Sequence, residues 1–484
     1  MKGLTKMKVE KKRFVDIILC VFLLLFFYII TFFWGSDSEN LRFLIGVSVC
    51  LFFFCTYALY QYFGTFNNLF IWYYIIFYIF SNGQYLLLLF NVPMGELAGL
   101  RWLQLSPQIR VDALLFCTGA QICLAVGALI VNPSDYFKRL EIKQIYLNES
   151  FRKKIKNLGI IMMIISIPID LDIQVKRTIQ YISLGYSSEL EEATSMIGSL
   201  ALFCLPGCYL TALSQINKNW KSKYLPLLYI VIRSVLMLLA GKRGQSLGCL
   251  CAVLWYIVAT MPKINYKRNK VFTIVKYAIV AYFFLVIIDT IRAVRDIENR
   301  SLVMVFNQFI ESFVSPTLIK DFFNELGGSI RPLVVNMQYM QSGVLTHVYG
   351  ASFLAPIIMI IPNFLRFGLY EKFSSYGWLE IERTLSKKVN AGYGIGYSLN
   401  AEMYYNFGKY GFLFALLIGY VFSKFLTITG KDNKNKEVLW YAFIPTFFSL
   451  IIITTRGSFQ LVYKYIVWYI LLPYILVMSG ENVE

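Results

Sequence analysis

Hydrophobic runs of about twenty residues follow one another along most of the chain, separated by short polar stretches. Phe14 to Trp34 and Phe43 to Tyr62 are the first two. At ~1.5 Å per residue, a helix of this length crosses the ~30 Å hydrocarbon layer of a bilayer. The pattern therefore predicts membrane-spanning helices.

The whole chain divides into about twelve such segments, which predicts an all-α polytopic membrane protein. The fifth segment is the weakest, because Pro168 and Asp170 interrupt it. The ten segments after the first two are Leu69 to Phe90, Val111 to Val131, Asn157 to Leu171, Ser195 to Ile216, Tyr224 to Ala240, Gln245 to Met261, Val271 to Ile291, Tyr410 to Ile428, Val438 to Thr454 and Phe459 to Met478.

The lysines and arginines support this topology, because basic residues accumulate in cytoplasmic loops. If the N-terminus is cytoplasmic, every strongly basic stretch falls on the inner side, and both termini are cytoplasmic. These stretches are Met1 to Arg13, Asn132 to Lys156, Asn217 to Lys223, Lys263 to Lys270 and Lys424 to Lys436.

Composition and charge exclude several classes of protein and site. With 57% hydrophobic and only 15% charged residues, the chain is too apolar for a soluble fold. The net charge of +18 is dispersed among the inner loops, so we expect contact with anionic membrane lipid and no nucleic-acid partner.

All nine cysteines fall inside predicted helices, which indicates packing and neither a disulfide framework nor a metal cluster. No cofactor motif is present, and we expect neither metal nor cofactor.

Three regions follow from the segment pattern: residues 1–291 with helices one to nine, an extracytoplasmic loop over 292–408, and residues 409–484 with helices ten to twelve. A loop this long is usually functional or disordered. Its apolar runs argue against disorder, and Ala351 to Ile361 is too short to span a bilayer. Pro356 and Pro362 interrupt and close that run, so a re-entrant or interfacial helix is expected, or alternatively a lid that only packs.

Basic residues at the outer face depart from the positive-inside tendency and need another reason to be there. Lys242 and Arg243 occupy a predicted tight turn between two helices, and Arg292 and Arg295 lie three residues apart at the end of another. Guanidinium groups bind phosphate oxygens in pairs, so these four residues are candidates for binding a pyrophosphate. Ion pairs with the neighbouring aspartates are the simpler alternative.

Four further residues are candidates for a site. Arg233 lies near the middle of a predicted helix, where a charge is costly, so it either has a function or pairs with a carboxylate or backbone carbonyl. Glu402 is either a general base at the membrane boundary or a first-turn residue complementing a helix dipole. Asn406 lies one turn further on the same face. His347 is the chain's only histidine and is more often a packed polar residue than a catalyst.

Two stretches, taken together, resemble the Wzy-type polymerases of oligosaccharide repeat units. The first is Tyr349 to Leu354 followed by Ile361 and Pro362, and the second is Ala401 to Gly408 followed by Gly411 and Gly419. The turn Lys242-Arg243-Gly244 is similar to an outer arginine turn of that family.

Two details qualify this resemblance. The family often carries an arginine after the proline, where this chain has Asn363 and places Arg366 further on. Arg383 and Gly394 also have the Arg, ten residues, Gly spacing of some polymerase loops, although this spacing is common by chance.

The resemblance implies a metal-independent glycosyltransferase of the C type in the bacterial cytoplasmic membrane, making O-antigen, capsule or exopolysaccharide. Its substrates would be oligosaccharides linked to undecaprenyl pyrophosphate on the outer face. Glu402 would be the catalytic base, and Arg243, Arg292 and Arg295 would stabilise the leaving pyrophosphate. A chain-length regulator and a flippase would be its protein partners. Two alternatives stay open: a non-enzymatic flippase or exporter of the same lipid-linked glycan, and an O-antigen-type ligase.

Overall fold

The computed structural model describes residues 2–34, 38–90, 106–131, 147–184, 196–216, 220–260, 282–283, 285–287, 289–290, 293–294, 302–389, 395–427 and 434–479. Every regular element in these residues is a helix, as the sequence predicts. The chain forms two compact units. Unit 1 comprises Met1–Leu140, Leu326–Trp440 and Leu450–Trp468, and unit 2 comprises Glu141–Glu325, Tyr441–Ser449 and Tyr469–Glu484.

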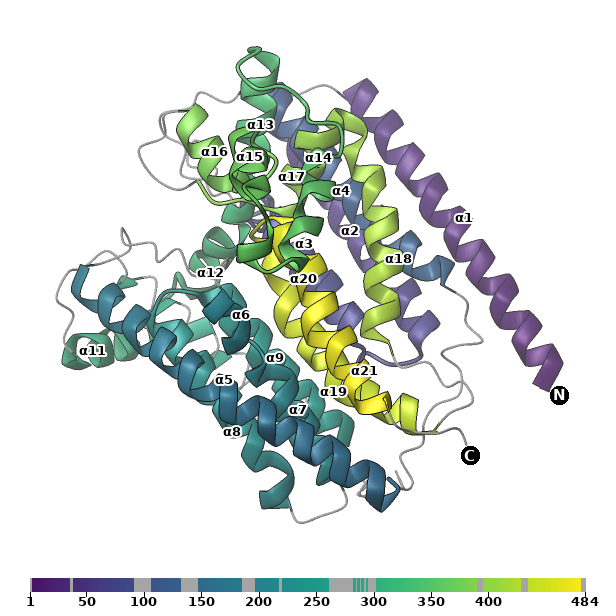
Figure 1. Cartoon of the computed structure of the whole chain (residues 1–484). Coiled ribbons are helices and arrows are strands. Elements are labelled where there is room, and N and C mark those ends of the chain that lie inside the picture. Colours follow the sequence, from purple (N-terminus) through teal and green to yellow (C-terminus); the bar gives the residue numbers. More distant parts are fainter. Residues whose placement is uncertain are drawn as a thin grey trace. The chain divides into compact units, whose positions relative to one another are not determined.

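Unit 1 combines four N-terminal helices with a series of shorter elements from the second half of the chain (Figure 1). The first four are α1 (Lys2–Trp34), α2 (Ser38–Phe63), α3 (Leu69–Leu88) and α4 (Pro107–Ile130). The later elements are η4 (Gly328–Ile330), α13 (Arg331–Gln341), α14 (Ala351–Leu354), η5 (Ala355–Ile360), η6 (Asn363–Leu365), α15 (Leu369–Ser375), α16 (Ile381–Lys388), α17 (Leu399–Phe407), η7 (Gly408–Phe414), α18 (Ala415–Leu426), η8 (Ile452–Thr455), η9 (Phe459–Leu461) and α20 (Val462–Ile466).

Glycines bring α18 and α4 into close contact. A Cβ atom on Gly419 would lie 2.2 Å from the carbonyl oxygen of Leu124, and one on Gly127 would lie 2.1 Å from that of Leu416. Only glycine fits at either position, and small residues at such crossings are typical of helix packing in membranes. A buried polar contact joins α17 to α3 in the same unit, because Asn400 Nδ2 donates to Ser81 Oγ over 2.8 Å.

Unit 2 is built mainly from α5 (Glu149–Leu184), α6 (Met196–Ala201), α7 (Cys204–Ser214), α8 (Trp220–Leu239) and α9 (Arg243–Thr260), followed by α11 (Leu302–Phe313), α12 (Leu318–Gly327) and α21 (Leu472–Met478). Helix α7 packs against both α5 and α8, and α8 against α9. The predicted tight turn between the last two is confirmed: Gly241 has φ 75°, and the Lys242 amide donates to the Met237 carbonyl over 2.8 Å. Helix α19 (Lys434–Ile451) and η10 (Val467–Leu471) contribute residues to both units.

Nine helical segments within the described residues are long and apolar enough to span a bilayer, which supports a polytopic membrane protein. The predicted third segment forms α3, which is not among those nine. The eighth forms the shorter apolar helix Gly244–Thr260, and most of the ninth lies outside the described residues. The count of twelve stays a prediction.

Two of these segments differ in length from their predictions. The fifth continues through Pro168 as one helix from Glu149 to Leu184, well past the predicted end at Leu171. The tenth begins at Leu399, eleven residues before the predicted Tyr410, because α17, η7 and α18 form one continuous helical segment. Glu402 is therefore part of a candidate span and does not precede it.

The predicted loop 292–408 is divided between the units, since Leu326 begins the second part of unit 1. Its described residues are largely helical, and the apolar run at Ala351 forms α14 and η5 before Pro362, as the two prolines suggested. Whether this run lies at a membrane surface stays a prediction.

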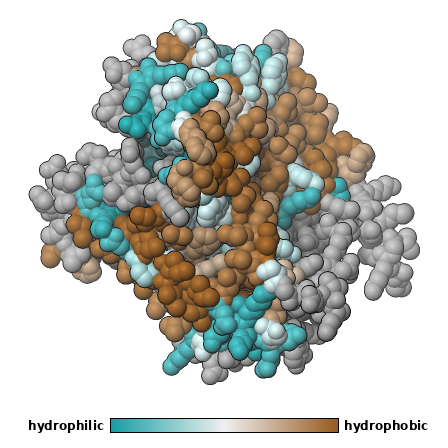
Figure 2. All heavy atoms as spheres, viewed as in Figure 1, coloured by the Kyte–Doolittle hydropathy of each residue, from teal (hydrophilic) through white to brown (hydrophobic). Residues whose placement is uncertain are grey.

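Large hydrophobic side chains cover much of the face shown in Figure 2. On α1, for example, Phe22 is 62% exposed and Leu25 is 58% exposed. Soluble monomers rarely expose continuous apolar surface of this extent. Contact with lipid acyl chains accounts for it.

Candidate active site

The two stretches that carry the family resemblance meet inside unit 1. Ser352 in α14 lies against Glu402 and Asn406 in α17. All three side chains are buried, and Glu402 is 0% exposed. Residues about fifty positions apart in the chain therefore form one polar cluster, which we call the Glu402 cluster.

The position of Glu402 follows from the start of α17. Ser398 caps this helix, because its hydroxyl accepts from the Ala401 amide over 3.3 Å, while its carbonyl accepts from the Glu402 amide over 3.0 Å. The first turn thus directs the Glu402 side chain into the core of the unit and not toward solvent. An acidic residue in the first turn can also complement the helix dipole, so this alternative role for Glu402 is compatible with its position.

Both carboxylate oxygens of Glu402 already accept hydrogen bonds. Ser352 Oγ donates to Oε1 over 2.9 Å, and the backbone amide of Phe459 donates to Oε2 over 2.6 Å. A buried carboxylate is retained only where such donors compensate for its lost hydration. Glu402 therefore joins three separate segments of unit 1: α14, α17 and the start of η9.

Asn406 completes the cluster. Its Nδ2 donates to Ser352 Oγ and to the Glu402 carbonyl oxygen, both over 2.7 Å, and its Oδ1 accepts from the Ser352 amide over 3.4 Å. The prediction that Asn406 and Glu402 share a face is confirmed. The Ser352 hydroxyl therefore donates to Glu402 and accepts from Asn406, and the Asn406 amide group is held in one orientation.

His347 lies beside this cluster and is only half-buried. Its Nδ1 is 3.3 Å from the carbonyl oxygen of Tyr405, and because a carbonyl can only accept, Nδ1 carries the proton. This contact fixes the tautomer and leaves Nε2 as the basic nitrogen. The ring lies over Gly408, where a Cβ atom would be 3.1 Å from Nε2.

The backbone around His347 is unusual. Tyr349 has φ 47° and its side chain is 83% exposed, while Gly350 and Gly408 have φ 90° and 61°. A tyrosine in the left-handed region is strained by about 1–3 kcal/mol, and such strain concentrates at functional sites. Two bonds hold the segment in place: the Val348 amide donates to Tyr405 O and the Tyr349 amide donates to Asn406 O.

Arg366 also lies in unit 1 and is buried, with 4% of its surface exposed. Its Nε donates to the Ile361 carbonyl over 2.8 Å, and its guanidinium carbon lies 5.7 Å from the centroid of the Tyr370 ring. Burial lowers the pKa of Arg366, whereas Tyr370 and Glu371 act in the opposite direction. Even so, an arginine pKa stays far above neutral pH, so the group is charged.

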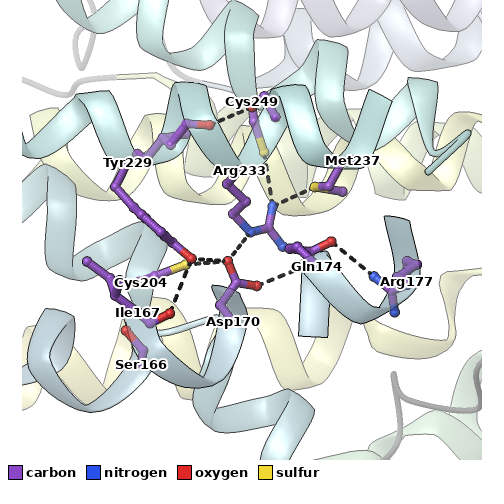
Figure 3. A network of polar contacts seen from close by, with 12 residues as sticks. Ser166, Ile167, Asp170, Gln174, Arg177, Cys204, Tyr229, Arg233, Met237 and Cys249 are labelled. Carbon is purple, nitrogen blue, oxygen red and sulfur yellow. Dashed lines mark hydrogen bonds and ion pairs between the residues drawn. The ribbon is translucent and has the colours of Figure 1, made fainter. Parts of the chain in front are cut away.

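Arg233 has a partner that the sequence did not reveal. In unit 2 its Nε donates to Asp170 Oδ2 over 2.9 Å, and both side chains are buried (Figure 3). Tyr229 Oη donates to the same carboxylate oxygen over 2.6 Å, and Gln174 Nε2 donates to Oδ1 over 3.0 Å. Arg233 is therefore paired with a carboxylate, which was one of the two alternatives predicted from the sequence. The ion pair joins α5 to α8.

The predicted basic turn is described only in part. Lys242 is exposed at the turn before α9, in unit 2. Arg243 begins α9, but its side chain lies outside the described residues, as do Arg292 and Arg295. Their proposed role in binding pyrophosphate stays a prediction.

Sequence reasoning missed the two donors to Glu402. Ser352 was inside a quoted stretch, but an isolated serine carries no signal of its own, and the Phe459 amide is a backbone group that no sequence pattern marks. Among the described residues, no group of three or more His, Cys, Asp or Glu side chains could hold a metal ion.

Comparison with known proteins gives one match. The family model described as O-antigen polysaccharide polymerase Wzy matches residues 15–483. No curated protein and no solved structure matches the chain.

Proposed function

Since this match over nearly the whole length shows that the chain belongs to the O-antigen polysaccharide polymerase Wzy family, we propose that it polymerises undecaprenyl-pyrophosphate-linked repeat units. The reaction would take place on the outer face of the bacterial cytoplasmic membrane, with both termini of the chain in the cytoplasm. It would need no metal ion. The observation that carries the proposal is the family match, and the Glu402 cluster formed by the two characteristic stretches supports it.

The proposed reaction is a glycosyl transfer. A hydroxyl group of the lipid-linked repeat unit attacks the anomeric carbon of the growing glycan. The bond from that carbon to the pyrophosphate oxygen breaks, and undecaprenyl pyrophosphate leaves with the bonding electrons. The hydroxyl proton passes to a base, while cationic groups stabilise the charge of the leaving group. Lys242, Arg243, Arg292 and Arg295 are our sequence-based proposals for those cations.

Two residues are proposed for the base. Glu402 is the sequence-based candidate, but it could accept the proton only after Ser352 or the Phe459 amide had moved away, because both its oxygens are engaged. His347 is half-buried, and with Nδ1 directed at the Tyr405 carbonyl oxygen its Nε2 makes no hydrogen bond within the part of the chain that the structure describes. The geometry favours His347 as the base, with Glu402 and Asn406 holding the segment that carries it.

The alternatives differ in what they predict. A flippase would move the lipid-linked glycan without bond formation, and a ligase would transfer the glycan to a different acceptor. Family membership favours the polymerase over both. A chain-length regulator and a flippase are proposed as partners in the cell.

The test is a polymerisation assay with purified protein in nanodiscs. Lipid-pyrophosphate repeat units are the only substrate, and products are separated on a gel. A ladder of products that differ by one repeat unit is expected. Absence of a ladder, with the glycan joined only to a lipid acceptor that is added in a parallel reaction, would refute the polymerase and indicate a ligase.

A further inference from the structure

Helix α11 of unit 2 has two exposed faces of opposite character. Phe306, Ile310 and Phe313 are spaced so that they share one face of the helix, and they are 61%, 52% and 37% exposed. Asn307 and Glu311 are exposed as well, and they share the adjoining face. One side of α11 is therefore apolar, the next is polar, and both are open to the surroundings.

A third side attaches α11 to the rest of the unit. Ser312 is 1% exposed, and Val305 and Phe309 on the same side of the helix are partly buried. At 3.6 residues per turn, this side lies between the polar face and the apolar face. The attachment therefore leaves both faces free and directs them away from each other.

The contacts of Phe313 connect the apolar face to a predicted membrane segment. The Phe313 ring lies 5.3 Å from that of Tyr282 and 5.5 Å from that of Phe283, between ring centroids, and Tyr282 Oη donates to the Phe313 carbonyl. Tyr282 and Phe283 belong to the predicted ninth segment, Val271 to Ile291, and are themselves 38% and 43% exposed. The apolar face of α11 thus continues a surface that is expected to contact lipid.

Neither water alone nor hydrocarbon alone suits both faces. In water, Phe306 and Ile310 would form part of an exposed apolar surface, and in hydrocarbon the Asn307 amide and the Glu311 carboxylate would lose their hydration. Helix α11 is also too short to span a bilayer, because its 12 residues extend about 18 Å against a layer of ~30 Å. Amphipathic helices of this kind typically lie along the membrane surface, with the apolar face about 5–10 Å deep at the boundary of headgroups and acyl chains.

We infer that α11 lies in the plane of the membrane surface, with Phe306, Ile310 and Phe313 among lipid acyl chains and with Asn307 and Glu311 among headgroups and water. The lipid of the surrounding bilayer is the partner of the apolar face. This inference goes beyond the proposed function, because it concerns a helix outside the candidate spans and does not depend on the reaction. It anchors the beginning of the predicted loop 292–408 to the membrane.

The test places a fluorescent amino acid, by codon suppression, at one position of α11 at a time. The positions are Phe306 and Ile310 on the apolar face and Asn307 and Glu311 on the polar face, in the full chain in nanodiscs. Emission is quenched either by iodide in the water or by lipids that carry a doxyl group on the acyl chain. The doxyl lipids should quench the two apolar positions more than iodide does, and iodide should be the stronger quencher at the two polar positions.

Two standards and the depth of the doxyl group define the boundary. Phe22, which is 62% exposed in the candidate span Lys12–Thr31, is the standard for the bilayer interior, and the exposed Ser375 is the standard for water. A doxyl group near the headgroup should quench the apolar positions of α11 more than one near the bilayer centre, whereas the order should be reversed at Phe22. At Ser375 iodide should be the stronger quencher.

Three outcomes would overturn the inference. Iodide as the stronger quencher at all four positions of α11 would show that the helix lies in water. If neither quencher reached Phe306 and Ile310, a second copy or another part of the chain would cover them. Stronger quenching of these two positions from the bilayer centre would show a helix inserted into the core and not lying at its surface.

A measurement on the unmodified chain guards against a fluorescent residue that disturbs the helix. Lipids with a photoreactive diazirine on the acyl chain near the headgroup should label the peptide that contains α11 and spare the one that contains α16, whose exposed residues are charged. An unlabelled α11 peptide would overturn the inference. The ladder assay stays independent: a chain that makes no ladder but passes both lipid tests would refute the polymerase and leave α11 at the membrane surface.

Discussion

Replacing Glu402 with glutamine tests whether this carboxylate acts as a catalytic base or only stabilises the Glu402 cluster through its hydrogen bonds. The carboxylate accepts from two donors, Ser352 Oγ and the Phe459 amide. A glutamine oxygen can accept from only one of them, and its NH₂ group must face the other. One hydrogen bond to a charged group is lost and the second becomes neutral, which together destabilise the fold by about 2–4 kcal/mol.

A double-mutant cycle with Ser352→Ala measures the contact directly. Equilibrium unfolding in mixed micelles would be followed for Glu402→Gln, Ser352→Ala and the double variant. Because the two side chains share one hydrogen bond, the double variant should cost about 1–3 kcal/mol less than the sum of the single ones. Glu371→Gln, which changes an exposed carboxylate of the same unit, is the control and should leave stability nearly unchanged.

Turnover in the ladder assay then separates the two roles. If Glu402 is the base, Glu402→Gln should lose about a hundredfold or more in rate, while Ser352→Ala stays near the wild type. If Glu402 only holds the site together, both variants should slow polymerisation, and combining them should add little. Additive stability effects in the cycle would refute the Glu402 cluster as a structural unit.

Three further predictions concern other parts of the chain. Arg243→Ala should abolish polymer at unchanged protein level and Arg243→Lys should recover little, because lysine cannot bind phosphate bidentately; wild-type chain lengths on a gel would contradict this. Asp170→Asn should lower stability by about 3–5 kcal/mol, because it leaves Arg233 charged and buried, whereas a joint exchange of both residues for apolar ones should cost much less in the same unfolding measurement. A cysteine at Ser375, which is exposed, should react only with reagents added from the outside, and labelling from the cytoplasmic side would refute the topology.

Much of the helical architecture could be predicted from the sequence, because the length of an apolar run and the positions of basic residues are local properties. Errors arose where local signals conflict with packing. Pro168 and Asp170 suggested an interrupted helix that ends at Leu171, but α5 continues to Leu184. Leu399 rather than Tyr410 begins the tenth span, because Asn400 at its start finds a hydrogen-bond partner inside the unit.

The site could be predicted only in part for the same reason. Glu402, Asn406 and Arg366 stood out by residue type and position. Their partners did not, since the contacts of Glu402 with Ser352 and with the Phe459 amide depend on tertiary structure. Arg233 was identified as anomalous, but the choice among possible partners required the α5 to α8 contact that brings Asp170 to it.

The hydrogen bond between Ser81 and Asn400 joins residues 319 positions apart, and it has a consequence for biosynthesis. At roughly 5–20 residues per second, the ribosome needs about 15–60 s to make the intervening chain. During that time α3 and α4 are in the membrane without α17 and α18, and their buried polar groups lack these partners. The amide that completes the Glu402 cluster is made later still, at Phe459. A ribosome-bound chain therefore cannot assemble the Glu402 cluster until the segment that carries Phe459 has been made, so this cluster forms only when synthesis is nearly complete.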